Sequence, residues 1–210
     1  MKNLIKTHLY LNNEKDEKGR IAESSLVHGL RNIRLITGRN QDTGLANPGG
    51  YLGNWIGAIG YITILDQIGT CYRPEFKERI NETTMPSIQK ALVYFTSLTK
   101  EEIYAVYALR NAFHHDFSLL NINLNKKKYC HHFEVDAHPT NYVIRLPKTP
   151  WDGNISSRNR TNATYVNLQA LGDLVEGIYT ELLRLESENK LVLELDGGEL
   201  ELKARYIFYH

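Results

Sequence analysis

Apolar side chains recur at steps of three and four residues over most of the chain, which is the period of an α-helix. The stretch 51–69 is apolar on most sides, which indicates a place in the middle of a helical bundle. Gly53, Gly57 and Gly60 would each weaken an isolated helix by up to about 1 kcal/mol, so we expect close helix packing around them. Gly38 is a suitable stop for the first long helix. The pattern predicts helices over residues 21–38, 51–69, 86–98, 99–117 and 162–188.

Two of these helices begin beside residues that are typical of N-termini. Pro86 suits the first turn of a helix, with Thr83 or Thr84 as the capping residue. Thr161 or Asn162 is expected to cap the last long helix, because a side-chain oxygen there can accept a hydrogen bond from a free backbone N–H.

The hydrophobic period changes from helical to alternating after residue 121. Residues 129–135 and 142–146 alternate between apolar and polar on either side of a turn, which predicts a β-hairpin. Residues 191–195 and 200–204, joined around Asp196-Gly197-Gly198, predict a second hairpin.

The predicted fold class is therefore mainly α, an up-and-down bundle of four to five helices with a small antiparallel β appendage. We expect a single domain over residues 1–210, with the appendage at 121–148 and 190–206. The apolar content of 42% and charged content of 23% are ordinary for a globular protein. The net charge is +1, so any contact with nucleic acid must come from a local patch.

The two cysteines, Cys71 and Cys130, do not suggest a disulfide framework, and a reducing cytoplasm is the simplest setting. The first ten residues are interrupted by polar side chains and do not read as a secretory signal. The longest apolar stretch, 55–65, is too short to span a bilayer. We therefore expect a cytoplasmic protein that does not contact a membrane.

The helix over 99–117 carries the candidate chemistry. Thr99 stands three residues before Glu102, which is the spacing of a capping box. The face that follows is apolar in its first half and then presents Arg110 and His114. A cation and a titratable base thus stand where an apolar stripe would otherwise continue.

These side chains allow two interpretations. Arg offers a planar fork for phosphate, and His can take and return a proton near neutral pH, so together they suit a phosphodiester. The structural alternative is a helix end with His114 near the negative dipole terminus and Arg110 paired with an acidic neighbour. Asp66 and Gln67 are either end-cap residues or polar groups aimed at Arg110, and the cap interpretation is favoured.

Arg110 and Asn111, followed after three more residues by His115, resemble the Arg-polar-spacer-His signature of HEPN domains, an all-helical superfamily of nucleotide-binding proteins and ribonucleases. The resemblance spans residues 20–120 and the helix near 162–188 by pattern. One departure concerns Phe117, because toxin-type members often carry Tyr there, to which a partner enzyme attaches AMP. Phe117 has no hydroxyl, so that route of regulation is not expected at this residue.

The resemblance implies a metal-independent endoribonuclease that needs no cofactor and acts in a toxin–antitoxin or phage-defence role. His115 would be the general base or acid, Arg110 would stabilise the phosphorane and Asn111 would orient one of them, with His114 as an alternate base. The implied partners are RNA, a second copy of the chain across a dimer interface that contains the motif, and an antitoxin protein. The competing hypothesis is a non-catalytic HEPN-like module that binds a nucleotide or a protein, and a third is a plain dimer seam.

Two basic groups outside this helix are candidate RNA contacts. Lys126, Lys127 and Lys128 precede the first predicted hairpin and could form a basic lip. Arg158 and Arg160 lie in a polar loop that is either disordered or able to close over a substrate.

Arg31, Arg34 and Arg39 lie on or beside the first long helix, where a solvated face is favoured over phosphate contact. No metal site is expected, because the spacing of the histidines and cysteines matches no structural zinc pattern and adjacent strand residues face opposite sides. The residues concerned are His114, His115, Cys130, His131, His132 and His138.

Overall fold

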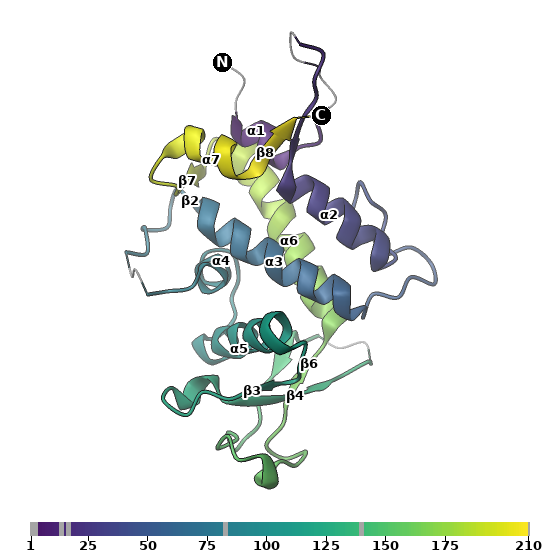
Figure 1. Cartoon of the computed structure of the whole chain (residues 1–210), viewed down its shortest axis with the longest axis vertical. Coiled ribbons are helices and arrows are strands. Elements are labelled where there is room, and N and C mark those ends of the chain that lie inside the picture. The colour runs from purple at the N-terminus through teal and green to yellow at the C-terminus, as the bar shows by residue number, and fades with distance from the viewer. Residues whose placement is uncertain (1–3, 13–14, 16–17, 82–83, 139–140, 210) are drawn as a thin grey trace.

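A computed structural model describes residues 4–12, 15, 18–81, 84–138 and 141–209 of the chain. About 48% of the chain is helical and the strands are short, so the structure is consistent with the predicted mainly α class (Figure 1). The helices are α1 Leu4–Leu9, α2 Ser25–Ile36, α3 Trp55–Cys71, α4 Ser87–Phe95, α5 Lys100–Asp116, α6 Leu168–Ser187 and α7 Gly198–Tyr206. The strands are β1 Ala22–Ser24, β2 Tyr72–Pro74, β3 Leu120–Asn121, β4 His131–Val135, β5 Ile144–Arg145, β6 Thr164–Val166, β7 Leu191–Leu193 and β8 Ile207–Tyr209, with short 3-10 turns η1 Lys127–Tyr129 and η2 Ile155–Ser157.

Helix α3 lies at the centre of the helical part and packs against α2, α4 and α6 (Figure 1). Its glycines allow this close approach: a Cβ at Gly57 would lie 2.1 Å from Thr37 Cγ2, and one at Gly60 would lie 2.5 Å from Ile33 Cγ1. The expectation of close packing is thus confirmed for Gly57 and Gly60. Gly53 precedes the helix and meets no other helix.

The predicted helix starts are correct at α5 and wrong at two other helices. The capping box between Thr99 and Glu102 is formed in both directions. Helix α4 has Pro86 at its N-cap position without a side-chain cap, so Thr84 does not serve, and Thr83 lies outside the described residues. Helix α6 is capped by Asn167 rather than by Thr161 or Asn162, because residues 164–166 first form strand β6.

The first predicted hairpin does not form. Strands β4 and β5 each pair with β6, which lies between them and runs parallel to β4 and antiparallel to β5. The sheet order β3-β4-β6-β5 is therefore mixed, and the expected antiparallel appendage is only partly antiparallel. Alternation along a sequence identifies a strand but not its partner. Strand β6 is three residues long, too short for its period to be recognised.

The second predicted hairpin is also wrong. Strand β7 pairs with β2, about 120 residues away in sequence, and residues 198–206 form helix α7 rather than a strand. Gly198 has a φ of +58°, which only glycine adopts readily, and the chain enters the helix there instead of turning back. After α7 the chain adds β8 to β1, and α7 contacts α1, so the C-terminal elements lie beside the N-terminal ones (Figure 1).

Two arginines expected on a solvated face are buried. The guanidinium of Arg34 forms a bidentate pair with Glu176 of α6, with Nη2 2.7 Å from Oε2, and Tyr61 donates to the same carboxylate at 2.8 Å. Arg39 pairs with Asp173 at 2.6 Å and donates to the carbonyl of Gly44. Both arginines tie the loop after α2 to helix α6, so neither is free to follow a phosphate backbone. Arg31 is partly exposed and pairs with Asp42.

Candidate functional site at the end of helix α5

Helix α5 lies between the helical part of the molecule and the four-stranded sheet, as Figure 1 shows. It is helical without interruption to Asp116. Phe117 then adopts the left-handed conformation with a φ of 50°, and the N–H of Ser118 reaches back to the carbonyl of Ala112 at 3.0 Å. Trp55, the first residue of α3, stacks on Phe113 with centroids 5.2 Å apart and contacts Phe117 at 5.9 Å. The end of α5 is thereby fixed against the start of α3.

Arg110 points toward α3 and pairs with an acidic side chain there. Its Nε donates to Oδ2 of Asp66 at 3.0 Å, and the other carboxylate oxygen of Asp66 accepts from the backbone N–H of Ile88 at 3.2 Å. Asp66 therefore faces Arg110, as one of its two interpretations expected, and it caps the first turn of α4 rather than an end of its own helix. Gln67 does neither, because its amide donates to His8 and Ser25 on another side of α3.

The guanidinium of Arg110 keeps its outer edge accessible. Its side chain is 30% exposed and that of Asp66 is 26% exposed. Nη1 lies 3.4 Å from the amide oxygen of Asn111, and Nη2 has no hydrogen-bond partner among the described residues. Because Asp66 occupies Nε, the two Nη groups are the donors left for an anion.

His114 shares the Arg110 face of the helix. Its Nε2 lies 3.4 Å from Oγ1 of Thr63, whose hydroxyl donates to the carbonyl of Ile59 at 3.0 Å. Thr63 is thus an acceptor for the Nε2 proton, which leaves Nδ1 as the basic nitrogen. Partial burial, and next the positive charge of Arg110, lower the pKa of His114. The imidazole is therefore neutral at neutral pH, which is the form that can accept a proton.

His115 lies on another side of the helix. It is exposed, and on an ideal helix it lies about 100° from His114 and about 140° from Arg110. Because α5 stays helical through Asp116, no local distortion turns it back. Within one chain, Arg110, Asn111 and His114 come together with Asp66 and Thr63, and His115 does not join them. No pattern in the sequence pointed to Thr63.

The other candidate RNA contacts lie elsewhere. The ammonium of Lys128 lies over the ring of Tyr104. Tyr104 comes six residues before Arg110, so these two residues of α5 are about 9 Å apart along the helix and about 120° apart around it. Lys126 and Lys127 are exposed beside it. Arg158 and Arg160 are exposed in a loop that is ordered by hydrogen bonds of Asn154, Asn159 and Asn162 (among them Asn159 N–H to Asn162 Oδ1 at 3.0 Å). The structure does not bring these basic residues onto the face that holds Arg110.

Two other histidines are buried and hydrogen-bonded inside the fold. His8 is fully buried between Tyr72 and Gln67, and His132 donates to Asn162 at 2.7 Å. Among the residues that the structure describes, no three His, Cys, Asp or Glu side chains are grouped so that they could hold a metal ion. Cys71 and Cys130 are both free and buried.

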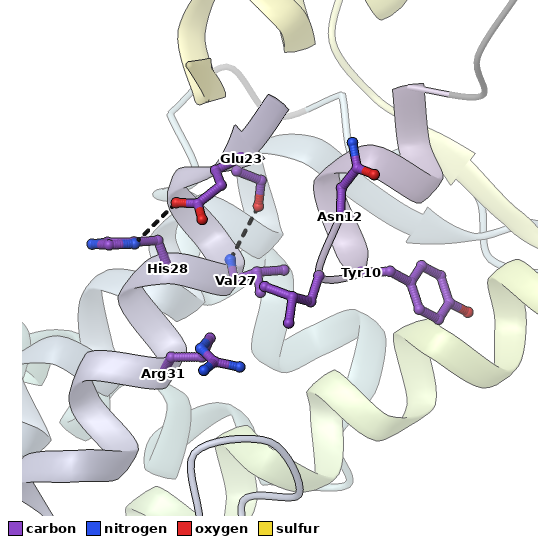
Figure 2. A pocket seen from close by; sticks show the side chains of 8 residues that line it. Tyr10, Asn12, Glu23, Val27, His28 and Arg31 are labelled. Carbon is purple, nitrogen blue, oxygen red and sulfur yellow. Dashed lines mark hydrogen bonds and ion pairs between the residues drawn. The ribbon is translucent and has the colours of Figure 1, made fainter. Parts of the chain in front are cut away.

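A small recess of about 30 Å³ lies between the end of α1, β1 and α2 (Figure 2). His28 and Glu23 lie at its rim with 3.3 Å between Nδ1 and Oε2, and Arg31 comes from the next turn of α2. This volume has room for one or two water molecules but not for a substrate. It is therefore not a rival to the site on α5.

Comparison with known proteins gives no match for this chain among protein-family models, curated proteins or solved structures. In the described part of the chain, no helix has both the length and the apolarity required to cross a membrane.

Proposed function

We propose that the protein is a metal-independent endoribonuclease of HEPN type, acting in a toxin–antitoxin or phage-defence role. The observation that supports this most directly is that the guanidinium of Arg110, oriented by an ion pair, and the neutral imidazole of His114 lie on the same accessible face of α5. Asp66 fixes Arg110 through Nε, and Thr63 contacts His114 four residues later on the same face. That combination offers two donors for a phosphate and one base for its neighbouring hydroxyl.

In this chemistry, Nδ1 of neutral His114 accepts the proton of an RNA 2′-hydroxyl. The O2′–P bond forms and the P–O5′ bond breaks, which leaves a 2′,3′-cyclic phosphate on one fragment. The Nη groups of Arg110 stabilise the charge that builds on the phosphoryl oxygens. The departing 5′-oxygen needs a proton, which an imidazole on the other side of the substrate would give.

A second copy of the chain would supply that imidazole through His115. In one chain His115 faces solvent about 100° from His114, so it can meet the substrate only across an interface. Apolar side chains flank the site: Ile56 and Phe117 are each 56% exposed beside Trp55. These residues suit the contact between two copies of α3 and α5.

The test uses a labelled single-stranded RNA incubated with the purified protein in EDTA. Arg110→Ala and His114→Ala are expected to lower the cleavage rate about a hundredfold or more, and His115→Ala is expected to do the same because the second copy then lacks the imidazole that protonates the leaving oxygen. Arg184→Ala, on the exposed side of α6, is the matched arginine control and should cleave normally. A 2′-deoxy residue at the cleaved position should block the reaction. Unchanged cleavage by both Arg110→Ala and His114→Ala would refute the assignment.

One observation favours a non-catalytic binding module instead. The carboxylate of Asp66 neutralises much of the charge of Arg110, which weakens its stabilisation of a phosphorane but still permits binding of a nucleotide or a protein. This alternative predicts no cleavage by the wild-type chain, together with protection of a bound nucleotide that Arg110→Ala abolishes.

A further inference from the structure

A cavity lies at the other end of α5, away from Arg110. Its volume is about 330 Å³, which is within the range of small-molecule sites. Three segments line it: the first two turns of α5 with Glu101 and Tyr104, the region of η1 and the start of β4, and residues 146–151 after β5. Nothing in the proposed ribonuclease chemistry uses this cavity.

The walls of the cavity are mostly apolar. Leu146, Pro147 and Pro150 contribute aliphatic surface, and Trp151 and Tyr104 contribute aromatic rings. Trp151 is only 3% exposed, and its indole N–H donates to the carbonyl of Asn154 at 2.9 Å. Its ring is therefore held in place before any ligand arrives, which favours a flat apolar guest.

Lysines dominate the charge at the rim. The ammonium of Lys128 lies 3.9 Å from the centroid of Tyr104, and Lys127 lines the cavity beside it. Lys100 lies 5.9 Å from the same Tyr104 ring, and the N-terminus of α5 adds partial positive charge. Glu101 is the one carboxylate among the lining residues. The balance of these groups favours an anion at the mouth of the cavity.

His131 lines the cavity with an uncharged imidazole. Its Nε2 lies 3.2 Å from the carbonyl of Lys128 and must donate to it, so Nδ1 accepts from the hydroxyl of Thr164 at 2.8 Å. Burial lowers the pKa of His131 to about 4, so it carries no charge at neutral pH. The hydrogen bond to the carbonyl of Lys128 also holds the backbone at the end of η1 against β4.

We propose that this cavity binds a small aromatic acid, with the ring between Tyr104 and Trp151 and the anionic group beside Lys127 and Lys128. A nucleotide fits less well, because the described lining residues include no Asn, Gln, Ser or Thr side chain that could read the edge of a base. The site does not depend on the ribonuclease proposal, since it lies on a different face of α5 and uses none of the same residues.

The test follows the fluorescence of Trp151. The sequence has two tryptophans, so Trp55→Phe leaves Trp151 as the single reporter. The probe is 4-nitrobenzoate, which quenches indole fluorescence on contact, and 4-nitrobenzyl alcohol is its uncharged counterpart. We expect saturable quenching by the acid and binding of the alcohol that is about tenfold weaker. Calorimetry with the unsubstituted chain measures the same affinities independently of Trp55.

Substitutions test whether binding depends on the cavity itself or only on the positive charge of the lysine run. Lys128→Gln should weaken 4-nitrobenzoate about tenfold, whereas Lys126→Gln, in the same lysine run but outside the lining, should not. Pro150→Phe, at an exposed rim position, should block the cavity without disturbing the core. Absence of saturable quenching, equal binding of acid and alcohol, or an equal effect of Lys126→Gln and Lys128→Gln would overturn the proposal. Tighter binding of AMP than of the acid would overturn the ligand class.

Discussion

The carboxylate of Asp66 and the guanidinium of Arg110 join helices α3 and α5 with 3.0 Å between Oδ2 and Nε. The second oxygen of Asp66 accepts from the backbone of Ile88, so one side chain connects three helices. This arrangement gives Arg110 a fixed orientation whether or not the face beside it binds a phosphate. The structural contribution of Asp66 can therefore be measured by stability, and the functional contribution of Arg110 can be measured by activity.

Asp66→Asn should cost less stability than Asp66→Ala. Asparagine keeps an oxygen for the Ile88 N–H and loses the ion pair with a partly exposed partner, so we expect a loss of up to about 1 kcal/mol. Alanine also leaves the first turn of α4 uncapped, and the loss should reach about 1–3 kcal/mol. Urea unfolding of both variants measures the difference.

Asp42→Asn is the control for the Asp66 variants, because Asp42 pairs with Arg31 but is 70% exposed and should leave the midpoint unchanged. Equal losses from Asp66→Asn and Asp66→Ala would show that Asp66 does not cap α4.

Alanine substitutions at two helix glycines should change the stability of the fold in opposite directions. A Cβ at Gly69 of α3 would lie 1.8 Å from the backbone oxygen of Ser87, so Gly69→Ala forces α3 and α4 apart and should destabilise by about 1–3 kcal/mol. A Cβ at Gly177 of α6 meets nothing within 4 Å, so Gly177→Ala should stabilise by about 0.5–1 kcal/mol. Thermal and urea unfolding report both signs. A stabilising Gly69→Ala would mean that α3 and α4 are not in close contact there.

Acid should destabilise the fold through buried histidines. Burial lowers the pKa of His8 from 6.5 to about 4, and Gln67 donates to its Nε2 at 2.9 Å, so a proton on Nε2 would face another donor. As the pH falls below 6.5, the unfolded chain binds a proton that folded His8 does not accept until about pH 4. Stability is therefore full above pH 6.5 and falls between pH 6.5 and 4, by up to about 1.4 kcal/mol per pH unit for each such histidine.

Urea midpoints at pH 7.5, 6.5, 5.8 and 5.0 measure this slope before most carboxylates titrate. His8→Gln should have lower stability at pH 7.5 but a shallower pH dependence than the wild type, because the titrating group is gone. His131, whose pKa is also lowered to about 4 by burial, should contribute a second part of the slope. Identical slopes for wild type and His8→Gln would contradict a neutral buried His8.

Part of the candidate site followed from local sequence. The capping box of Thr99 and Glu102 sets the start of α5, and the helical period places Arg110 and His114 four residues apart on one face. The partners on α3 followed only in part: the sequence left two alternatives for Asp66, which lies 44 residues from Arg110, and it did not indicate Thr63, which lies 51 residues from His114. A period within one helix fixes which side chains share a face but not which helix that face meets.

The same division holds for the whole fold. The sequence alone determined the long helices, the close packing at Gly57 and Gly60 and the presence of strands after residue 121, because propensity, period and capping act within a few residues. Only the tertiary structure decided that β6 separates β4 from β5, that residues 198–206 form a helix and that Arg34 is buried against Glu176. Those outcomes depend on which distant segments bury each other's surfaces and satisfy each other's hydrogen bonds, and no local pattern encodes that choice.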